Sequence, residues 1–438
     1  MRKILLLFTI FFILNPVVYA QNVDPHYQEK ANFICTQIKE SPSFNYEDYF
    51  SSEFIQQIPY EMMIDILQDL YLNFGSCAKA HFTDTSNKLK RFHLELTNQI
   101  FAKASIALEE NEPYKISGFL FNGVSDRKIQ IKSWKDLIEV GEQAGGLFSA
   151  TLKNYSSQEN SYEIQGSQFQ ALASGFKLYI LGSLLNKIET KNLSWQQEFP
   201  IQPKWKSLPS GIMHTWPDGQ RISIKDYAKF MISISDNTAT DHLLHIIGRT
   251  YIESQLAHMR NSFFSMNTPF LSTMEMFKIK WALPLEKIHA FIAAEVKEKR
   301  STLQELSSIP NEMIGKNGVP MDKPAFIRQI EWFASTNDMC EVMKWIKNKT
   351  EKLNDPTALD ILAVNTPFAH VGADSHWSYA GYKGGSEPGV LTMTYLLKSK
   401  ENTWGCLSMA LNDEANGISQ YLFFDIVEKT LRFSESQI

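Results

Sequence analysis

The chain has 438 residues, of which 44% are hydrophobic and 21% are charged, and its formal net charge at pH 7 is −5. This composition is too apolar for a disordered protein, and the chain is long enough for two packed domains. The slightly acidic balance argues against an extended basic surface for nucleic acid, so a small molecule or a peptide is the expected ligand.

The first twenty residues are typical of a secretory signal peptide. A basic start at Arg2 and Lys3 precedes an apolar run over residues 4–14, and the predicted cleavage site follows Ala20. A retained membrane anchor is the alternative, but the run is shorter than the roughly 20 residues that span a bilayer. We therefore expect a secreted or periplasmic protein with no stable membrane insertion after cleavage of residues 1–20.

The four cysteines show none of the Cys-x-x-Cys spacings that zinc or redox sites use. We therefore expect no metal and no cofactor. Cys35 and Cys77 belong to the same N-terminal segment and are the expected disulfide partners in an oxidising compartment. Cys340 and Cys406 lie in apolar stretches, where buried free thiols and a second disulfide both remain open.

Residues 21–127 are predicted to form a small α+β domain. A helical pattern over 61–75 comes first, and alternating apolar residues over 92–96 and 102–108 then indicate antiparallel strands. No cluster of acids, histidines or metal ligands stands out, so a scaffolding or dimerising role is expected. A pocket in the concave face of the sheet is the functional alternative.

Residues 128–438 are predicted to form a larger domain. A helix ending in two glycines precedes a strand over 147–154, and many helices follow. Apolar strands return over 389–398 and 404–412, before a final helix. Strands at both ends with helices between them predict a sheet assembled from distant parts of the chain.

One segment of this domain combines a serine and a lysine at the start of a buried helix. Ser174 and Lys177 lie three residues apart, and an apolar pattern of helical period follows over 178–188. A helix N-terminus favours an oxyanion, and a lysine one turn away accepts the serine proton if its pKa is depressed. The spacing alone is weak evidence, because Ser76 and Lys79 share it without any partner motif.

Two further motifs follow Ser174 in the chain. They are Ser235-Asp236-Asn237 and Lys383-Gly384-Gly385-Ser386. Three such motifs in this order match the signature of class A β-lactamases and penicillin-binding proteins. From about residue 130 to 438 the chain therefore resembles the penicillin-recognising serine hydrolases. The resemblance implies an α/β domain of the β-lactamase/transpeptidase type, an antiparallel sheet flanked by helices, with an all-helical subdomain.

The resemblance also implies catalytic roles. Ser174 is the expected nucleophile, Lys177 its base, and Ser235 the relay that returns a proton to the leaving nitrogen. Class A enzymes also carry a Glu-x-x-Leu-Asn loop whose glutamate activates water, and only Glu275 is a candidate here, without the asparagine. Because Ser272 lies three residues before it, a capping box is the expected role of Glu275, and catalysis is the alternative.

Substrate binding is assigned by the same resemblance. Asn237 is expected to hold an amide of the substrate, and Lys383 its carboxylate. Gly385 leaves room for a substrate along the strand, and the backbone N–H groups of Ser386 and Ser174 are the expected oxyanion hole. The third motif reads Lys-Gly-Gly instead of Lys-Thr-Gly, so one hydroxyl is missing, which Ser386 could replace.

A weaker resemblance concerns the domain order. The segments 231–244, 268–278 and 382–391 are similar to a branch in which a steroid-isomerase-like domain precedes the β-lactamase-like one, as in the hydrolase of clavulanic-acid gene clusters. We thus predict a serine hydrolase acting through an acyl-serine on β-lactams or related amides and esters. The alternative is a binding protein for penicillin or cell-wall peptides with very slow or no turnover. Nothing in the sequence indicates an oligomeric state.

Overall fold

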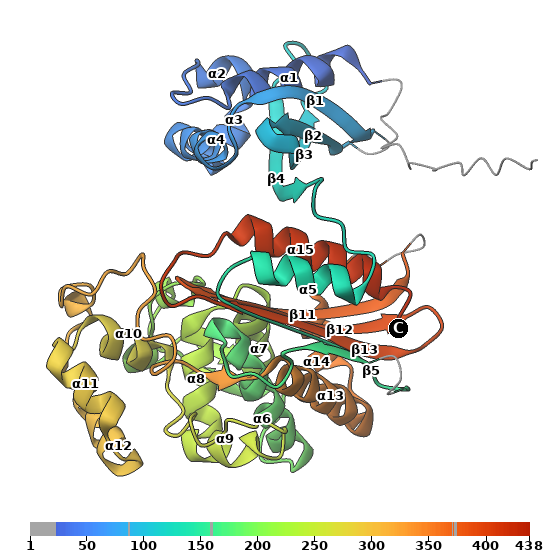
Figure 1. Cartoon of the computed structure of the whole chain (residues 1–438). Coiled ribbons are helices and arrows are strands. Elements are labelled where there is room, and N and C mark those ends of the chain that lie inside the picture. Colours follow the sequence, from blue (N-terminus) through green and yellow to red (C-terminus); the bar gives the residue numbers. More distant parts are fainter. Residues whose placement is uncertain (1–22, 86–87, 158–160, 370, 372–374) are drawn as a thin grey trace, which may run out of the picture. The chain divides into compact units, whose positions relative to one another are not determined.

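A computed structural model describes residues 23–85, 88–157, 161–369, 371 and 375–438. The expected signal peptide lies outside these residues. The chain divides into two compact units, residues 1–129 and 130–438 (Figure 1). Within the described part of the chain, no helix has both the length and the apolar character needed to cross a membrane.

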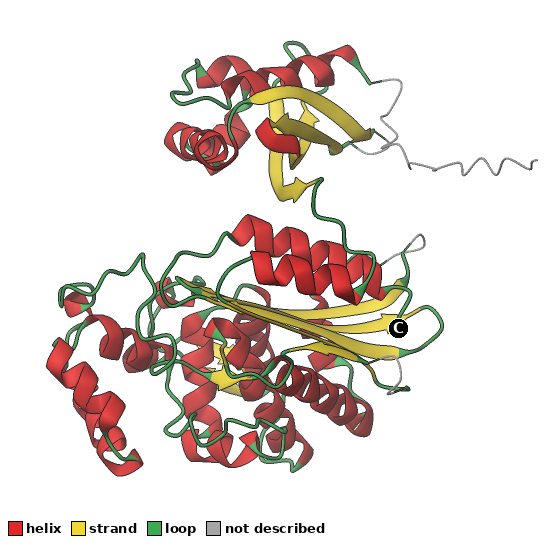
Figure 2. Cartoon of the chain, in the orientation of Figure 1, coloured by secondary structure: helices red, strands yellow, loops and turns green. Residues whose placement is uncertain are grey.

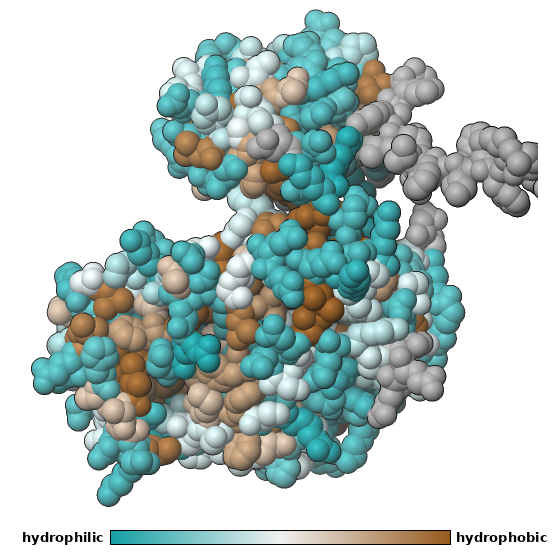
Figure 3. Space-filling view, in the orientation of Figure 1, coloured by the Kyte–Doolittle hydropathy of each residue, from teal (hydrophilic) through white to brown (hydrophobic). Residues whose placement is uncertain are grey.

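The smaller unit packs helices against an antiparallel sheet. The helices are α1 (Pro25–Gln37), α2 (Tyr46–Tyr49), α3 (Ser52–Gln57) and α4 (Tyr60–Phe74). The strands, paired in chain order, are β1 (Cys77–Asp84), β2 (Lys90–Leu96), β3 (Ile100–Leu108) and β4 (Ile116–Asp126). Cys35 of α1 forms a disulfide with Cys77 of β1, which confirms the expected pair. Most surface residues of this unit are hydrophilic in the view of Figure 3.

The larger unit is built on a five-stranded antiparallel sheet (Figure 2). In spatial order its strands are β11 (Trp377–Glu387), β12 (Val390–Ser399), β13 (Trp404–Asn412), β5 (Leu147–Asn154) and β6 (Tyr162–Ile164). The C-terminal strand β13 pairs with β5, which confirms that distant parts of the chain share one sheet. β11 lies at an edge of this sheet.

Helices cover both faces of the five-stranded sheet. α5 (Trp134–Gln143) and α15 (Gln420–Ser434) lie on one face, and α13 (Thr336–Leu353) packs on the other (Figure 1). The remaining helices are α6 (Lys177–Glu189), α7 (Ile224–Ser233), α8 (Asn237–Ile247), α9 (Arg249–Leu256), α10 (Thr273–Trp281), α11 (Leu285–Ala293), α12 (Val296–Glu305) and α14 (Thr357–Ala363). Two small ribbons pair β7 (Gln170–Ala171) with β10 (Phe333–Ala334), and β8 (Glu198–Pro200) with β9 (Arg221–Ser223). The predicted architecture, a sheet flanked by helices with a helical part, is confirmed.

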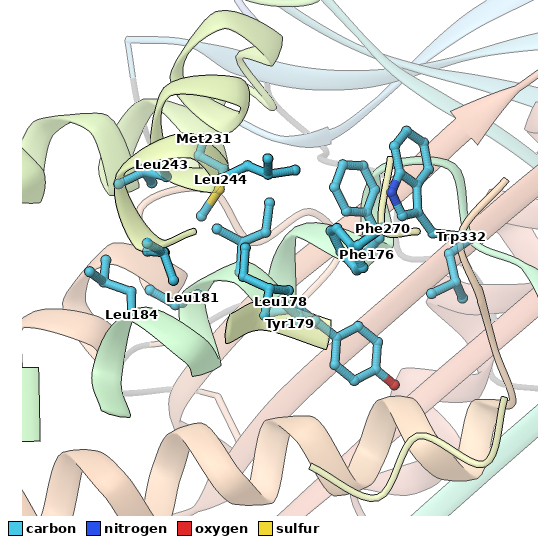
Figure 4. Close-up of a cluster of buried hydrophobic side chains, with 14 of the residues drawn as sticks. Phe176, Leu178, Tyr179, Leu181, Leu184, Met231, Leu243, Leu244, Phe270 and Trp332 are labelled. Carbon is cyan, nitrogen blue, oxygen red and sulfur yellow. The ribbon is translucent and has the colours of Figure 1, made fainter. Parts of the chain in front are cut away.

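Helix α6 lies at the centre of the helical part. The sequence pattern predicts one buried face, but every residue from Lys177 to Asn186 is buried. Helices α7, α8, α9 and α13 all contact α6, so no face is left for solvent. Figure 4 shows Leu178 and Leu181 of this helix among the buried side chains of α7 and α8. This central position carries the polar Lys177 into the interior.

A second disulfide ties this core to the sheet. Cys340 of α13 is bonded to Cys406 of β13. The sequence did not decide between free thiols and a disulfide at these positions, and the structure has the disulfide.

Candidate active site

Ser174 lies in a tight turn immediately before α6. The turn is a 3-10 helix over Ala173–Phe176, so the α-helix begins at Lys177 and not at the serine. Within residues 170–186, all of which are described, Ser174 is the single residue that is not buried. An otherwise buried segment thus leaves one residue, the serine, partly exposed.

The backbone around Ser174 is held in an unusual conformation. Ala173 has a φ of 45°, in the left-handed region that residues with a Cβ rarely adopt. Thr392 Oγ1 donates a hydrogen bond of 2.9 Å to the carbonyl of Leu172, and the ring of Phe176 stacks on Trp332 with centroids 3.7 Å apart (Figure 4). Backbone strain of this kind is concentrated at functional sites.

Lys177 points from α6 to the loop that carries the second motif. Its Nζ lies within hydrogen-bond distance of three oxygens: the Ser235 carbonyl at 2.6 Å, Ser235 Oγ at 3.0 Å and Asn237 Oδ1 at 2.7 Å. Burial lowers the pKa of Lys177 well below its ordinary value, and the charge of Lys383 lowers it further. These conditions favour the neutral amine, whose two N–H groups can serve the Ser235 carbonyl and Asn237 Oδ1 while its lone pair is able to accept a proton from a hydroxyl.

Ser235 occupies the short loop between α7 and α8 with a φ of 58°. The neighbouring Asp236 caps α8 by accepting from the backbone N–H of Ala239 at 2.8 Å. The same carboxylate accepts from the backbone N–H groups of Ile212 and Met213 at 2.6 and 2.8 Å. Asp236 therefore organises this loop and fixes the position of Ser235.

Lys383 reaches the same hydroxyl from β11. Its Nζ donates to Ser235 Oγ at 3.1 Å and to the Gly384 carbonyl at 2.6 Å. Burial lowers its pKa to about 7. Ser235 Oγ is thus hydrogen-bonded to two lysines, and this arrangement suits a proton relay.

A cleft of about 360 Å³ opens at these residues. Ser174, Ser235, Lys383, Gly385 and Ser386 all line it, so the structure brings the three motifs together. Sequence reasoning missed its apolar lining, which no motif marks: Ile232, Ile234, Tyr382, Leu391, Met393 and Phe424. None of the described residues that line the cleft is an aspartate, a glutamate or a histidine.

Two other expected site residues have partners within the protein. Asn237 accepts from Lys177, and its Nδ2 donates to the Leu208 carbonyl at 3.1 Å, so its contact with a substrate amide stays a prediction. Ser386 is exposed at the cleft, and its Oγ accepts from Gln420 Nε2 at 3.4 Å.

Glu275 is not among the residues that line the cleft. Its carboxylate accepts from the backbone N–H of Ser272 at 2.7 Å, and Ser272 Oγ accepts from the backbone N–H of Glu275, so the expected capping box is confirmed. The other carboxylate oxygen accepts from Arg249 at 2.7 Å. Both oxygens of the candidate water-activating group are therefore engaged at the start of α10.

Comparison with known proteins identifies the family of the chain. Residues 132–363 match the β-lactamase enzyme family, a range that includes Ser174, Lys177 and Ser235 and ends before Lys383. The chain belongs to this family. A comparison with curated proteins found no match.

Several solved structures are similar to the larger part of the chain. A β-lactamase from Sphaerobacter thermophilus is 15% identical, with a TM-score of 0.47 over 70% of this chain and 98% of its own. An ancestral class A β-lactamase is 12% identical, with a TM-score of 0.49 over 69% and 99%. A point mutant of PBP-A, solved as an acyl-enzyme complex with penicillin G, is 14% identical, with a TM-score of 0.45 over 68% and 95%.

Proposed function

We propose that this chain is an exported serine hydrolase that opens β-lactams, or related amides and esters, through an acyl-enzyme on Ser174. The observation that carries the proposal is a partly exposed Ser174, three residues before a buried lysine of depressed pKa, in a cleft that residues of all three motifs line. Export is supported by the leader pattern and by the two disulfides. The smaller unit is proposed to be steroid-isomerase-like and to supply no catalytic group.

Acylation follows from the chemistry of these groups. Neutral Lys177 accepts the proton of Ser174 as the oxygen attacks the substrate carbonyl, and the backbone N–H groups of Ser174 and Ser386 stabilise the oxyanion. When the C–N bond breaks, Ser235 passes a proton to the nitrogen and is reprotonated by Lys177, which gives up the proton it took from Ser174 and returns to the neutral amine. Protonated Lys383 attracts the substrate carboxylate.

Hydrolysis of the acyl-enzyme is expected to be slow. It needs a base that deprotonates water next to the ester, and the described cleft lining contains no carboxylate or imidazole. Glu275 is engaged in the capping box and with Arg249. The same observation favours the second candidate function, a penicillin-binding or cell-wall-peptide-binding protein with little or no turnover.

The test is covalent labelling of the mature chain with a fluorescent penicillin, followed by intact mass and stopped-flow measurements. We expect an adduct on Ser174, its loss in Ser174→Ala, and a burst followed by slow release. Ser76→Ala is the matched control, because Ser76 has the same lysine spacing but precedes a strand, where residues three apart face opposite sides. An adduct that survives Ser174→Ala would overturn the assignment, and rapid turnover without a burst would overturn slow deacylation.

A further inference from the structure

A buried cluster of one lysine and two glutamates lies behind the turn that carries Ser174. The Nζ of Lys280, on α10, is 3.1 Å from Glu331 Oε1 and 2.8 Å from Glu387 Oε1. The side chains of Lys280 and Glu331 are fully buried, and that of Glu387 is 11% exposed. The acylation chemistry above uses none of these groups.

Glu331 connects the cluster to the nucleophile. Its Oε2 accepts from the backbone N–H of Ala173 at 3.1 Å, immediately before Ser174. Ala173 is the residue with the left-handed φ of 45°. Relaxation of that residue would rotate the peptide that carries the N–H of Ser174, so the bond from Glu331 maintains the direction of this oxyanion donor.

Glu387 connects the cluster to the opposite donor. It is the last residue of β11 and directly follows Ser386, whose N–H is the second proposed donor. β11 already touches the turn at Gly385, where an added Cβ would lie 2.0 Å from the Leu172 carbonyl oxygen. Lys280 therefore bonds to one glutamate on each side of the proposed oxyanion hole.

The charges of the cluster are compatible with its burial. Burial by itself lowers the pKa of Lys280, but the charges of the two neighbouring glutamates raise it above its ordinary value. Burial, followed by the charge of Glu331, raises the pKa of Glu387 well above its ordinary value. Each charge of the cluster thus has an oppositely charged partner within 3.1 Å, as a buried ionic group requires.

We propose that Lys280 is a positioning residue for acylation, which holds the turn of Ser174 and the end of β11 at the separation that the oxyanion needs. This inference rests on the proposed acyl-serine function. Lys280 touches no substrate and acts through Glu331 and Glu387.

The test compares Lys280→Met with Lys278→Met in the mature chain. Lys278 is a buried lysine of the same helix that donates to the Leu306 carbonyl, outside the cluster. The acylation rate constant is measured with fluorescent penicillin over a range of concentrations. We expect that of Lys280→Met to fall about 10- to 100-fold, which is no more than the effect of removing one oxyanion donor. The dissociation constant of the non-covalent complex and both constants of Lys278→Met should stay within about threefold of the parent. An unchanged acylation rate constant in Lys280→Met would overturn the proposal.

A second pair of variants covers the case in which Lys280→Met does not fold. Glu387→Leu retains the buried Lys280–Glu331 ion pair but removes the link to β11, so acylation should slow about tenfold. Glu387→Gln keeps an oxygen for Lys280 and should recover most of that loss. Equal rate constants for the two variants would contradict the positioning role.

Hydrogen exchange separates failure of this inference from failure of the proposed function. If penicillin does not label the parent, the acyl-serine function is wrong. Hydrogen exchange in the peptide 171–176 then tests by itself whether Lys280 holds the turn of Ser174 in place. Faster exchange in this peptide in Lys280→Met or Glu387→Leu, but not in Lys278→Met, supports the positioning role of Lys280. Unchanged exchange would overturn it.

Discussion

Gly385 is the point at which β11 comes closest to the turn that carries Ser174. An added Cβ would lie 2.0 Å from the carbonyl oxygen of Leu172 and 2.7 Å from the backbone nitrogen of Ser174. Both neighbours are backbone atoms and cannot rotate away. Glycine is therefore required here by the packing of two chain segments.

Gly385→Ala should slow acylation of Ser174 by at least about 100-fold, because the turn and the strand must separate and misalign the oxyanion donors. Overpacking should also lower the free energy of unfolding by about 1–3 kcal/mol. Penicillin labelling and thermal melting measure both effects. The control is Gly417→Ala, where an added Cβ meets nothing within 4 Å. A parent-like labelling rate in Gly385→Ala would refute the argument.

Lys383 should make substrate affinity depend on pH. Its pKa is about 7 because it is buried, so the charge that attracts a carboxylate is lost as the pH rises through that value. The dissociation constant of penicillin should rise up to about tenfold per unit above about pH 8, while the acylation rate constant changes less. Stopped-flow labelling at several pH values separates the two constants. A penicillin ester, which lacks the carboxylate, is the control, and a flat profile for penicillin itself would contradict the role of Lys383.

Contacts from neighbouring helices fix the start of helix α10. Ser272 and Glu275 form its capping box, and Asp241 of α8 accepts from the backbone N–H groups of Thr273 and Met274 at 2.7 and 3.1 Å. Arg249 adds an ion pair to Glu275. The start of α10 is thereby tied to the helical part, and its far end delivers Lys280 to the buried cluster.

Glu275→Gln should leave release of the acyl group within about threefold of the parent, because the carboxylate serves the helix and not a water molecule. It should lower stability by about 0.5–2 kcal/mol through loss of the ion pair with Arg249. Ser272→Ala, which removes the cap alone, should cost about 1 kcal/mol and serves as the comparison. Release is followed by mass spectrometry and stability by melting. A large fall in release in Glu275→Gln alone would identify Glu275 as the base.

The two units of the chain have separate hydrophobic cores. The core of the smaller unit runs from Ala31 to Ile116 in sequence, and the main core of the larger unit runs from Leu172 to Cys406. Each unit also contains its own disulfide. A unit with its own core is expected to fold alone.

A chain that begins at residue 130 should therefore melt cooperatively and be labelled by penicillin at a rate within about threefold of the full mature chain. All proposed catalytic and binding residues lie within it. Labelling kinetics and thermal melting are the measurements. Loss of labelling in a truncated chain that still melts cooperatively would show that the smaller unit shapes the site.

Much of the fold was predictable from local patterns. The helix α4, the strands β12 and β13 and the final helix α15 carry the apolar periods of their elements, and the structure has them where the patterns indicate. The Ser174, Ser235 and Lys383 motifs were also recognisable, because each is a short run of residue types in a known order. The capping box at Ser272 has a spacing that can be read directly.

The burial of α6 on every face was not predictable, because an amphipathic period says nothing about the number of helices that surround it. The cluster of Lys280, Glu331 and Glu387 escaped notice for a similar reason, since its members are up to 107 positions apart. A glutamate between Ile330 and Trp332 was the available signal. Short-range sequence patterns thus identified the elements and the reactive groups. Contacts between distant segments determine the pKa of Lys177, the disulfide between Cys340 and Cys406 and the close packing around Gly385. These contacts form only when the sheet and the helices pack together.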